Sequence, residues 1–98
     1  MSEPYKKNQD QNSVNVHRIT EEQIQQGFPG AKRIRSKTNI KGGSKRKRWQ
    51  WKKFILDEDT QHEAVEKFRE SDGKHLGECD PQTGEQTKPA NPKRRLQR

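Results

Sequence analysis

The sequence predicts a single small α+β domain in which one short helix precedes a meander of antiparallel strands. Segment 20–23 reads TEEQ, a capping-box pattern that predicts the start of a helix over about 20–27. Two turn signals, at 71–73 and 80–84, lie about ten residues apart, which is typical of consecutive antiparallel strands. At 98 residues the chain has room for at most one domain.

Strand signals dominate the second half of the chain. Tryptophan alternates with polar residues in 48–51, and the apolar run 54–56 follows. Residues 62–69 fit the period of a helix or of a strand, and both periods place His62 and Glu66 on one face. The spacing of the turns that follow favours the strand.

Three segments carry weaker signals. Residues 1–13 are polar without periodicity, so we interpret them as a flexible leader and assign the domain to 14–98. Residues 31–48 are predicted to be mostly irregular. Residues 85–98 are predicted to be a last short strand or an extended tail, because Pro89 and Pro92 exclude a helix.

The composition predicts a thin core. Leu, Ile, Val and Phe total 14 residues and the net charge is +8, a balance shared with disordered chains. We therefore expect a fold that is marginal alone and is stabilised by a partner. The large apolar residues from 49 onward are the expected core: Trp49, Trp51, Phe54, Ile55, Leu56, Val65, Phe68 and Leu76.

Several classes of protein do not fit the sequence. The single cysteine, Cys79, excludes an internal disulfide, and we expect it to be a small core residue. The three histidines have no zinc-ligand spacing with it, so no metal or other cofactor is predicted. No apolar run approaches the ~18 residues of a membrane span, and the polar start carries no signal peptide.

Charge is segregated along the chain. Residues 31–53 carry 11 basic and no acidic groups, residues 54–85 carry 3 basic and 10 acidic groups, and residues 86–98 carry 5 basic groups. Two cationic blocks around an anionic segment indicate a polyanion-binding surface with a distinct site inside it. A solvated charged surface or a disordered basic arm is the alternative.

The anionic segment contains the parts of a metal-free RNA-cleaving site. RNA carries its own nucleophile, the 2′-hydroxyl, so cleavage needs a base, an acid and a cation for the phosphorane. Glu66 is a candidate base and His62 a candidate acid, with Asp59 nearby and Arg94 or Arg95 as the cation. The alternative is that these are ordinary solvent-facing residues of a strand.

The basic run that ends at Arg48 is a candidate RNA-docking surface, with Lys45, Arg46 and Lys47 before it. The neighbouring tryptophans could stack on bases, but so few apolar residues are present that we expect both in the core. His75 is either a second ionisable group near the site or, as we favour, a strand residue paired across the sheet.

The chain resembles the C-terminal cytotoxic domain of the ribonuclease colicins and cloacin, which also forms the toxic tips of some pyocins and contact-dependent inhibition toxins. The match covers about residues 42–95. The motifs that carry it are 45–49 (KRKRW), 59–62 (DTQH), 65–66 (VE), 71–73 (SDG), 75–77 (HLG), 80–81 (DP), 83–84 (TG) and 92–94 (PKR). The chain departs from the family pattern at Glu58, Glu63 and Cys79.

The resemblance implies a small, strongly twisted antiparallel β-sheet with a short N-terminal helix. It implies a metal-independent endoribonuclease that cuts 16S rRNA at the decoding centre of the 30S subunit in the bacterial cytoplasm. An acidic immunity protein would neutralise it, which suits the charge of +8.

The resemblance also assigns roles to individual residues. Glu66 is the implied base, His62 the acid, Asp59 their support and Arg94 the phosphate stabiliser, while the RNA-binding set is Lys45, Arg46, Lys47, Arg48 and Lys93. The rival hypothesis is a non-catalytic basic protein that binds RNA or the ribosome.

Overall fold

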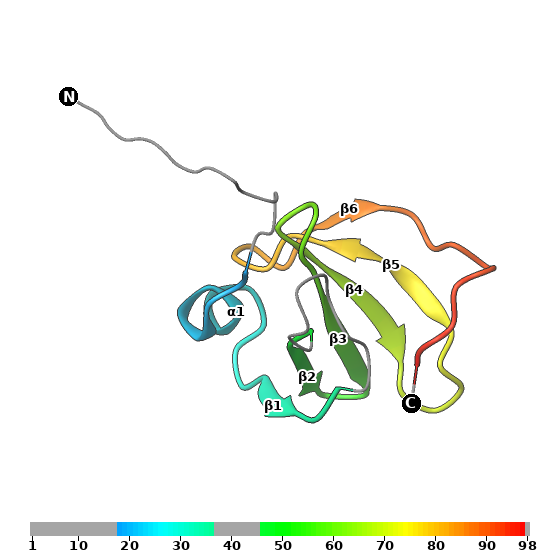
Figure 1. Ribbon diagram of the computed structural model, residues 1–98, viewed down its shortest axis with the longest axis horizontal. Helices are drawn as coiled ribbons and strands as arrows, with labels where there is room; N and C mark the ends of the chain where they lie inside the picture. The colour runs from blue at the N-terminus through cyan, green and yellow to red at the C-terminus, as the bar shows by residue number, and fades with distance from the viewer. Residues whose placement is uncertain (1–17, 37–45, 98) are drawn as a thin grey trace.

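A computed structural model of the chain describes residues 18–36 and 46–97 (Figure 1). One helix precedes six strands, which form a single antiparallel sheet in the order of the chain, β1 to β6. The elements are α1 (Glu21–Gly27), β1 (Lys32–Ile34), β2 (Arg48–Trp51), β3 (Phe54–Asp59), β4 (Ala64–Arg69), β5 (His75–Cys79) and β6 (Gln86–Lys88). The predicted helix and antiparallel sheet are confirmed, while the strong twist and the leader at 1–13, outside the described residues, stay predictions.

The capping box fixes the start of α1. The Thr20 hydroxyl accepts a hydrogen bond from the Gln23 backbone N–H at 3.1 Å, and the Gln23 side chain accepts one from the Thr20 N–H at 3.0 Å. These bonds satisfy backbone donors that the first turn of a helix leaves free. Ile24 is the residue of α1 that is buried, and the Glu21 side chain of the helix also accepts a hydrogen bond from the Trp49 indole in β2.

Two predictions about local structure are wrong in part. Residues 31–48 were expected to be mostly irregular, yet 32–34 form β1, which pairs with β2. All three residues of β1 are exposed, so backbone pairing at the sheet edge forms this strand without an apolar pattern. The strand expected over 62–69 begins at Ala64, and His62 lies in the turn before it, where Glu63 has a φ of 50°.

The core lies on the face of the sheet that α1 covers. Its buried members are Ile19, Ile24, Phe28, Ala31, Trp49, Leu56, Val65 and Cys79. Ile55 and Phe68 are buried on the opposite face, whereas Trp51, Phe54 and Leu76 are only half-buried. Trp49 is therefore a core residue and cannot stack on a base, and Cys79 is the small core residue that we expected. Among the described residues, no helix is long and apolar enough to span a membrane, since α1 has only 7 residues.

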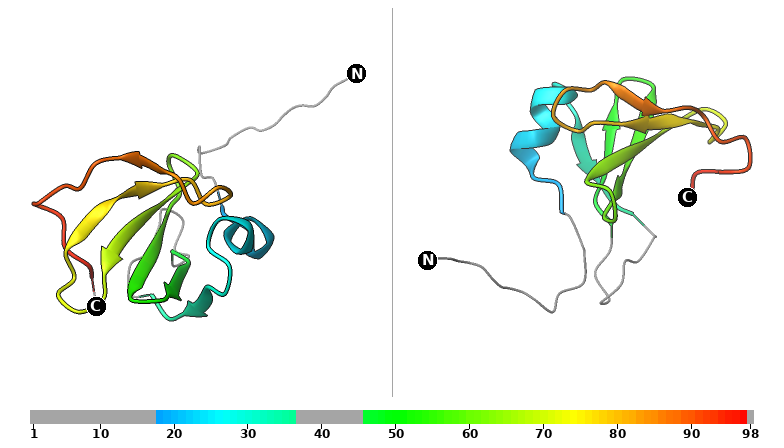
Figure 2. Two further views of the ribbon diagram at one scale, coloured as in Figure 1. Left: turned by 180° about the vertical axis from the view of Figure 1, so that it is seen from behind. Right: turned by 90° about the horizontal axis from the view of Figure 1, so that it is seen from above.

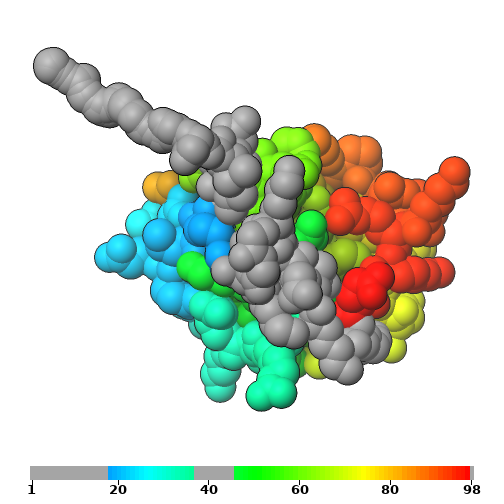
Figure 3. Space-filling view, in the orientation of Figure 1, coloured from blue at the N-terminus to red at the C-terminus, as the bar shows by residue number. Residues whose placement is uncertain are grey.

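The C-terminal segment, residues 89–97, returns along the sheet after β6. Lys74 pairs with Arg95 in an isolated antiparallel bridge, and the Leu96 N–H donates to the Gly73 carbonyl at 3.0 Å. Both views of Figure 2 place this segment at the side of the sheet away from α1, and Figure 3 shows it on the surface. Both predicted alternatives for 85–98 are therefore present: 86–88 form a short strand, and 89–97 form an extended tail.

A buried carboxylate joins three separate parts of the chain. Glu58 in β3 is fully buried and accepts hydrogen bonds from the backbone N–H groups of Ile19 at 2.8 Å and Lys47 at 2.9 Å. The Arg18 guanidinium lies 3.2 Å from the same carboxylate. Glu58 therefore holds the segment before α1 and the segment before β2 against β3.

Replacing Glu58 by alanine should destabilise the protein strongly. The change leaves the backbone N–H groups of Ile19 and Lys47 without this acceptor, and each unsatisfied buried donor costs about 1–3 kcal/mol. Urea unfolding measures the loss. Glu85→Ala, at an exposed carboxylate after the last tight turn, is the control and should stay within about 0.5 kcal/mol of wild type. Equal stability of the two variants would contradict the role of Glu58.

Candidate active site

A pocket opens between the sheet and the C-terminal segment, with a volume of about 380 Å³. Its wall includes all four residues predicted to be catalytic, together with two that were not: Asp59, His62, Glu66, Arg94, His75 and Glu78. The backbone of 88–92 closes the remaining side. Residues from four parts of the sequence thus converge on one cavity.

The register of the sheet explains why these side chains share a face. Glu66 in β4 lies opposite Asp57 in β3 and opposite Glu78 in β5. Directly paired residues of antiparallel strands project to the same face, and alternate residues along a strand do so as well. Asp57 and Asp59 therefore point to the pocket face of β3, whereas Glu58 between them points to the core.

His62 and Asp59 form an exposed dyad at the pocket rim. The His62 Nδ1 atom lies 2.9 Å from an Asp59 carboxylate oxygen, and the imidazole side chain is 54% exposed. The Gln61 N–H also donates to Asp59, at 3.0 Å, which holds the turn in shape. Partial burial alone would raise the pKa of Asp59, but the hydrogen bonds from His62 and Gln61 and the His62 charge lower it overall. Asp59 therefore stays ionised and orients the imidazole.

Glu66 has the opposite environment. Its carboxylate is buried, lies 2.7 Å from His75 Nε2 and lies 3.5 Å from Arg94 Nη1. Burial raises the pKa of Glu66 above its ordinary value, although the His75 hydrogen bond and the Arg94 charge act against it. A carboxylate with a raised pKa is a better base near neutral pH than an ordinary one. The two carboxylates at the site thus differ in protonation behaviour, which is typical of acid–base pairs.

His75 holds Glu66 in place. It is the strand residue that we favoured, in β5, but it also lies in the site, so both alternatives hold. Its Nδ1 atom accepts a hydrogen bond from the Asn91 backbone N–H at 2.8 Å, so this nitrogen carries no proton. The proton therefore sits on Nε2 and is donated to Glu66. The C-terminal segment fixes the tautomer of His75, and His75 orients the Glu66 carboxylate.

Glu78 is a pocket residue that the sequence analysis did not single out. The signal that would have revealed it is the strand pairing of β4 with β5, which cannot be counted from the sequence because the register shifts at Lys67 and Phe68. Ligand atoms of Asp59, His62 and Glu78 lie within 4.8 Å of one another, so among the described residues these three could hold a cation. Such groups also converge where protons are transferred, and the cluster alone does not indicate a metal.

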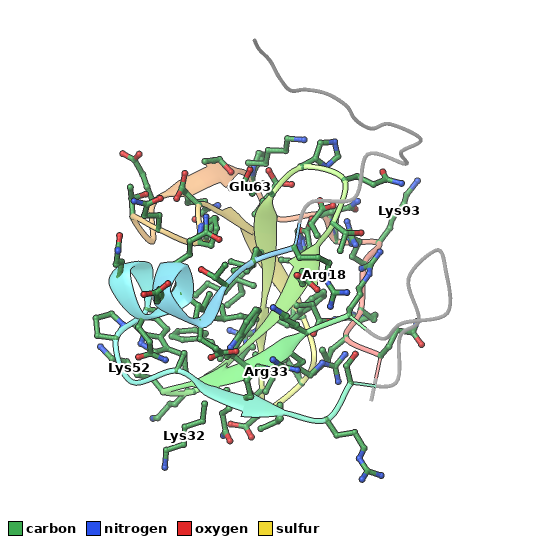
Figure 4. All side chains as sticks on the ribbon, turned by 60° about the vertical axis from the view of Figure 1, so that its left-hand side comes forward. Arg18, Lys32, Arg33, Lys52, Glu63 and Lys93 are labelled. Carbon is green, nitrogen blue, oxygen red and sulfur yellow. The ribbon has the colours of Figure 1, made fainter. Side chains whose placement is uncertain are left out.

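The predicted RNA-binding residues are not one surface. Arg46 and Lys93 line a second cavity of about 260 Å³ together with Arg94 and Arg95. Figure 4 shows Lys93 pointing away from the body of the protein. Lys45 lies outside the described residues.

Two residues of the basic run are tied to the protein itself. Lys47 donates from Nζ to the Ile19 carbonyl at 2.6 Å. The prediction that Arg48 contacts RNA does not fit its position, because its buried guanidinium makes two bonds to Asp57, at 2.5 and 2.9 Å. Arg48 neutralises an acidic residue of the sheet, and its side chain is buried.

Comparison with known proteins identifies the class of domain. A family model described as Cytotoxic matches residues 19–97, so the chain belongs to the Cytotoxic family. The match begins upstream of the region 42–95 in which the resemblance was visible, and it includes α1 and the residues that Glu58 holds.

The more particular relationship is to bacteriocins of Escherichia coli. Over 59 residues the chain is 49% identical to colicin E3, 48% identical to cloacin and 46% identical to colicin-E6. Each alignment covers 58% of this chain, and the chain spans about a tenth of the length of these relatives. The predicted resemblance to the ribonuclease toxin domains of colicins and cloacin is confirmed.

The hydrogen bonds of His75 predict its tautomer. We expect the proton of the imidazole to be on Nε2, because the Asn91 N–H occupies Nδ1. Nitrogen-15 chemical shifts of the ring distinguish the two nitrogens, and exposed His62 is an internal reference for a ring without this constraint. Protonation of His75 at Nδ1 would show that the C-terminal segment does not hold the site as described.

Proposed function

We propose that this domain is a metal-independent endoribonuclease toxin that cuts 16S rRNA at the decoding centre and stops translation. Cleavage proceeds by attack of the 2′-hydroxyl on the adjacent phosphate and leaves a 2′,3′-cyclic phosphate. The observation that carries the proposal is the pairing of a buried carboxylate of raised pKa, Glu66, with the exposed His62–Asp59 dyad in one pocket. Membership of the Cytotoxic family supports it.

Glu66 takes the proton from the 2′-hydroxyl in the first half of the reaction. Its raised pKa increases its basicity, and His75 contacts one carboxylate oxygen while Arg94 lies beside the other. As the O2′–P bond forms, negative charge develops on the phosphorane oxygens. Arg94 lies beside Glu66, and its side chain is 43% exposed, so the guanidinium can extend toward these oxygens. Because the guanidinium is planar, it can bind two of them at once.

His62 completes the reaction as the acid. Asp59 accepts the Nδ1 proton of the imidazole, so the Nε2 proton is the one that moves to the departing 5′-oxygen as the P–O5′ bond breaks. The exposure of His62 suits this role, because a leaving group on a large RNA must approach from solvent. One proton enters the protein at Glu66 and one leaves from His62, so the step balances.

The cavity lined by Arg46, Lys93, Arg94 and Arg95 suits the RNA backbone beside the cleaved bond. It adjoins the catalytic pocket, since Arg94 lines both. The target in this proposal is the 30S subunit in the cytoplasm of a bacterial cell. An acidic immunity protein would protect the producing cell, and the net charge of +8 provides its electrostatic complement.

Removing the base or the acid should abolish cleavage without removing binding. We expect Glu66→Gln and His62→Ala each to lower the cleavage rate by at least about 100-fold, because each removes a proton-transfer group. Primer extension across 16S rRNA, after incubation with intact 70S ribosomes and EDTA, should show one stop near the decoding centre for the wild type.

The matched control is Glu85→Gln, which removes an exposed carboxylate outside the pocket and should cleave like the wild type. Wild-type cleavage by Glu66→Gln would overturn the mechanism. Intact rRNA with tight ribosome binding by the wild-type protein would favour the rival hypothesis of a non-catalytic RNA-binding protein.

Binding should weaken steeply with salt, because lysine and arginine residues displace counterions from phosphates. With the inactive Glu66→Gln protein and a single-stranded rRNA fragment, the slope of log K against log salt should be about −0.7 per phosphate contact. Lys93→Gln should make the slope shallower by roughly one contact, while Arg48→Gln should not change it unless the fold is lost. A flat salt response would contradict the proposed cationic cavity.

A further inference from the structure

A second carboxylate faces the base across the sheet, and it has no part in the mechanism described so far. We propose that Glu78 is a positioning residue that acts through Glu66, as the negative neighbour that keeps this base able to accept a proton. The inference rests on the proposed function, since it concerns the same base. It concerns a residue that the comparisons do not assign.

The geometry of the pair is unusual for a stable sheet. Glu66 and Glu78 are direct partners in the β4–β5 ladder, and both are buried, with 3% and 7% of their surfaces exposed. Like charges directly opposite each other destabilise an antiparallel pair, and burial removes the water that would screen them. A buried acidic pair in a catalytic pocket is therefore placed at a cost in stability.

Strand β6 holds Glu78 in this position. The Thr87 hydroxyl lies 3.2 Å from one Glu78 carboxylate oxygen, and Lys88 Nζ lies 3.9 Å from the other. The lysine side chain is mostly exposed and its contact is long, so solvent screens most of its charge. These contacts fix the orientation of the Glu78 carboxylate, but they neutralise its negative charge only weakly.

Charged groups reach Glu66 from every element around it. From β3, Asp57 is paired with Arg48, and Asp59 is paired with His62 in the following turn. From the far side, His75 and Arg94 contact Glu66 itself, and Glu78 with Lys88 comes from β5 and β6. Among these described carboxylates, Glu78 is the one whose ion pair is longest.

The opposing effects on the pKa of Glu66 show what Glu78 contributes. Burial raises the pKa of Glu66, His75 and Arg94 lower it, and the charge of Glu78 raises it again. Arginine at the site is needed for the phosphorane, and histidine is needed to orient the base, so both would weaken the base if nothing opposed them. Glu78 opposes them without blocking the carboxylate oxygens that they contact.

The test is to remove the charge and keep the shape. In Glu78→Gln the amide can still accept from Thr87, and we expect the titration midpoint of Glu66 to fall by roughly one pH unit. Carbon-13 NMR of the glutamate carboxyl groups measures the midpoint, and the Glu66 signal is assigned by its absence from Glu66→Gln. In the wild-type-like control Glu85→Gln the midpoint should not move.

Activity gives a second readout. The acid limb of the pH–rate profile for rRNA cleavage should shift to lower pH in Glu78→Gln by the same amount as the Glu66 midpoint, while the rate at higher pH falls severalfold because the base is weaker. Glu78→Asp keeps the charge and should retain most of the wild-type profile. A purely structural role would lower the rate without moving the limb.

Stability gives a third readout with a definite sign. A carboxyl group whose pKa is raised by folding destabilises the protein once the pH exceeds its ordinary value of about 4.3. Glu78→Gln should therefore be more stable than the wild type to urea at neutral pH. The gain should shrink as the pH falls through the raised pKa of Glu66 and disappear well below its ordinary value, where Glu66 is protonated in both the folded and the unfolded state.

The outcomes separate the two proposals. An unchanged Glu66 midpoint in Glu78→Gln overturns this inference even if the wild type cleaves rRNA. If the wild type does not cleave, the proposed function fails, while the NMR titration still tests the coupling. Should Glu78→Gln not fold, Lys88→Gln replaces it, because loss of this exposed lysine should raise the Glu66 midpoint slightly and an unchanged or lower value would contradict the coupling.

Discussion

The carboxylate of Glu58 is the interaction that ties the separate parts of the chain to the sheet. The core is small, and the chain before α1 and the chain before β2 reach it through hydrogen bonds to this one side chain. Its neighbours Asp57 and Asp59 point the other way, to the pocket. The pleat of a single strand therefore divides three consecutive acidic residues between the interior and the pocket face of the sheet. A shift of one residue in the register of β3 would turn Glu58 toward the pocket face and turn Asp57 and Asp59 toward the core. Both the hydrogen bonds of Glu58 and the carboxylates of the pocket face would then be lost.

The pocket gathers more charge than a domain of this size would hold for stability alone. Four acidic residues on this face of the sheet have partners: Arg48 for Asp57, His62 for Asp59, His75 with Arg94 for Glu66, and, at a longer distance, Lys88 for Glu78. These pairs keep the site ordered where few apolar contacts exist. They also set the carboxylates apart in basicity, because Asp59 has its ion partner at the rim whereas Glu66 is desolvated. Stability and chemistry thus use the same contacts.

Features that are local in sequence were predictable, and those that depend on pairing were not. The capping box located α1 and the turn spacing identified β4 as a strand, since both signals lie within a few residues. Edge strand β1 carries no apolar pattern and was missed. Arg48 was predicted to contact RNA because it belongs to a basic run. The sequence does not show which face of the sheet a strand residue points to. The contact of His75 with Glu66 depends on an irregularity in the β4–β5 register, which no spacing rule reveals.

The C-terminal segment supplies Arg94 to the pocket and the Asn91 N–H that orients His75. Proteins are made from the N-terminus onward, so all six strands leave the synthesising ribosome before this segment does. The six strands alone therefore do not complete the candidate site, because Arg94 and the Asn91 N–H lie outside them. The candidate site is therefore complete only when residues 91–94 have docked on the sheet.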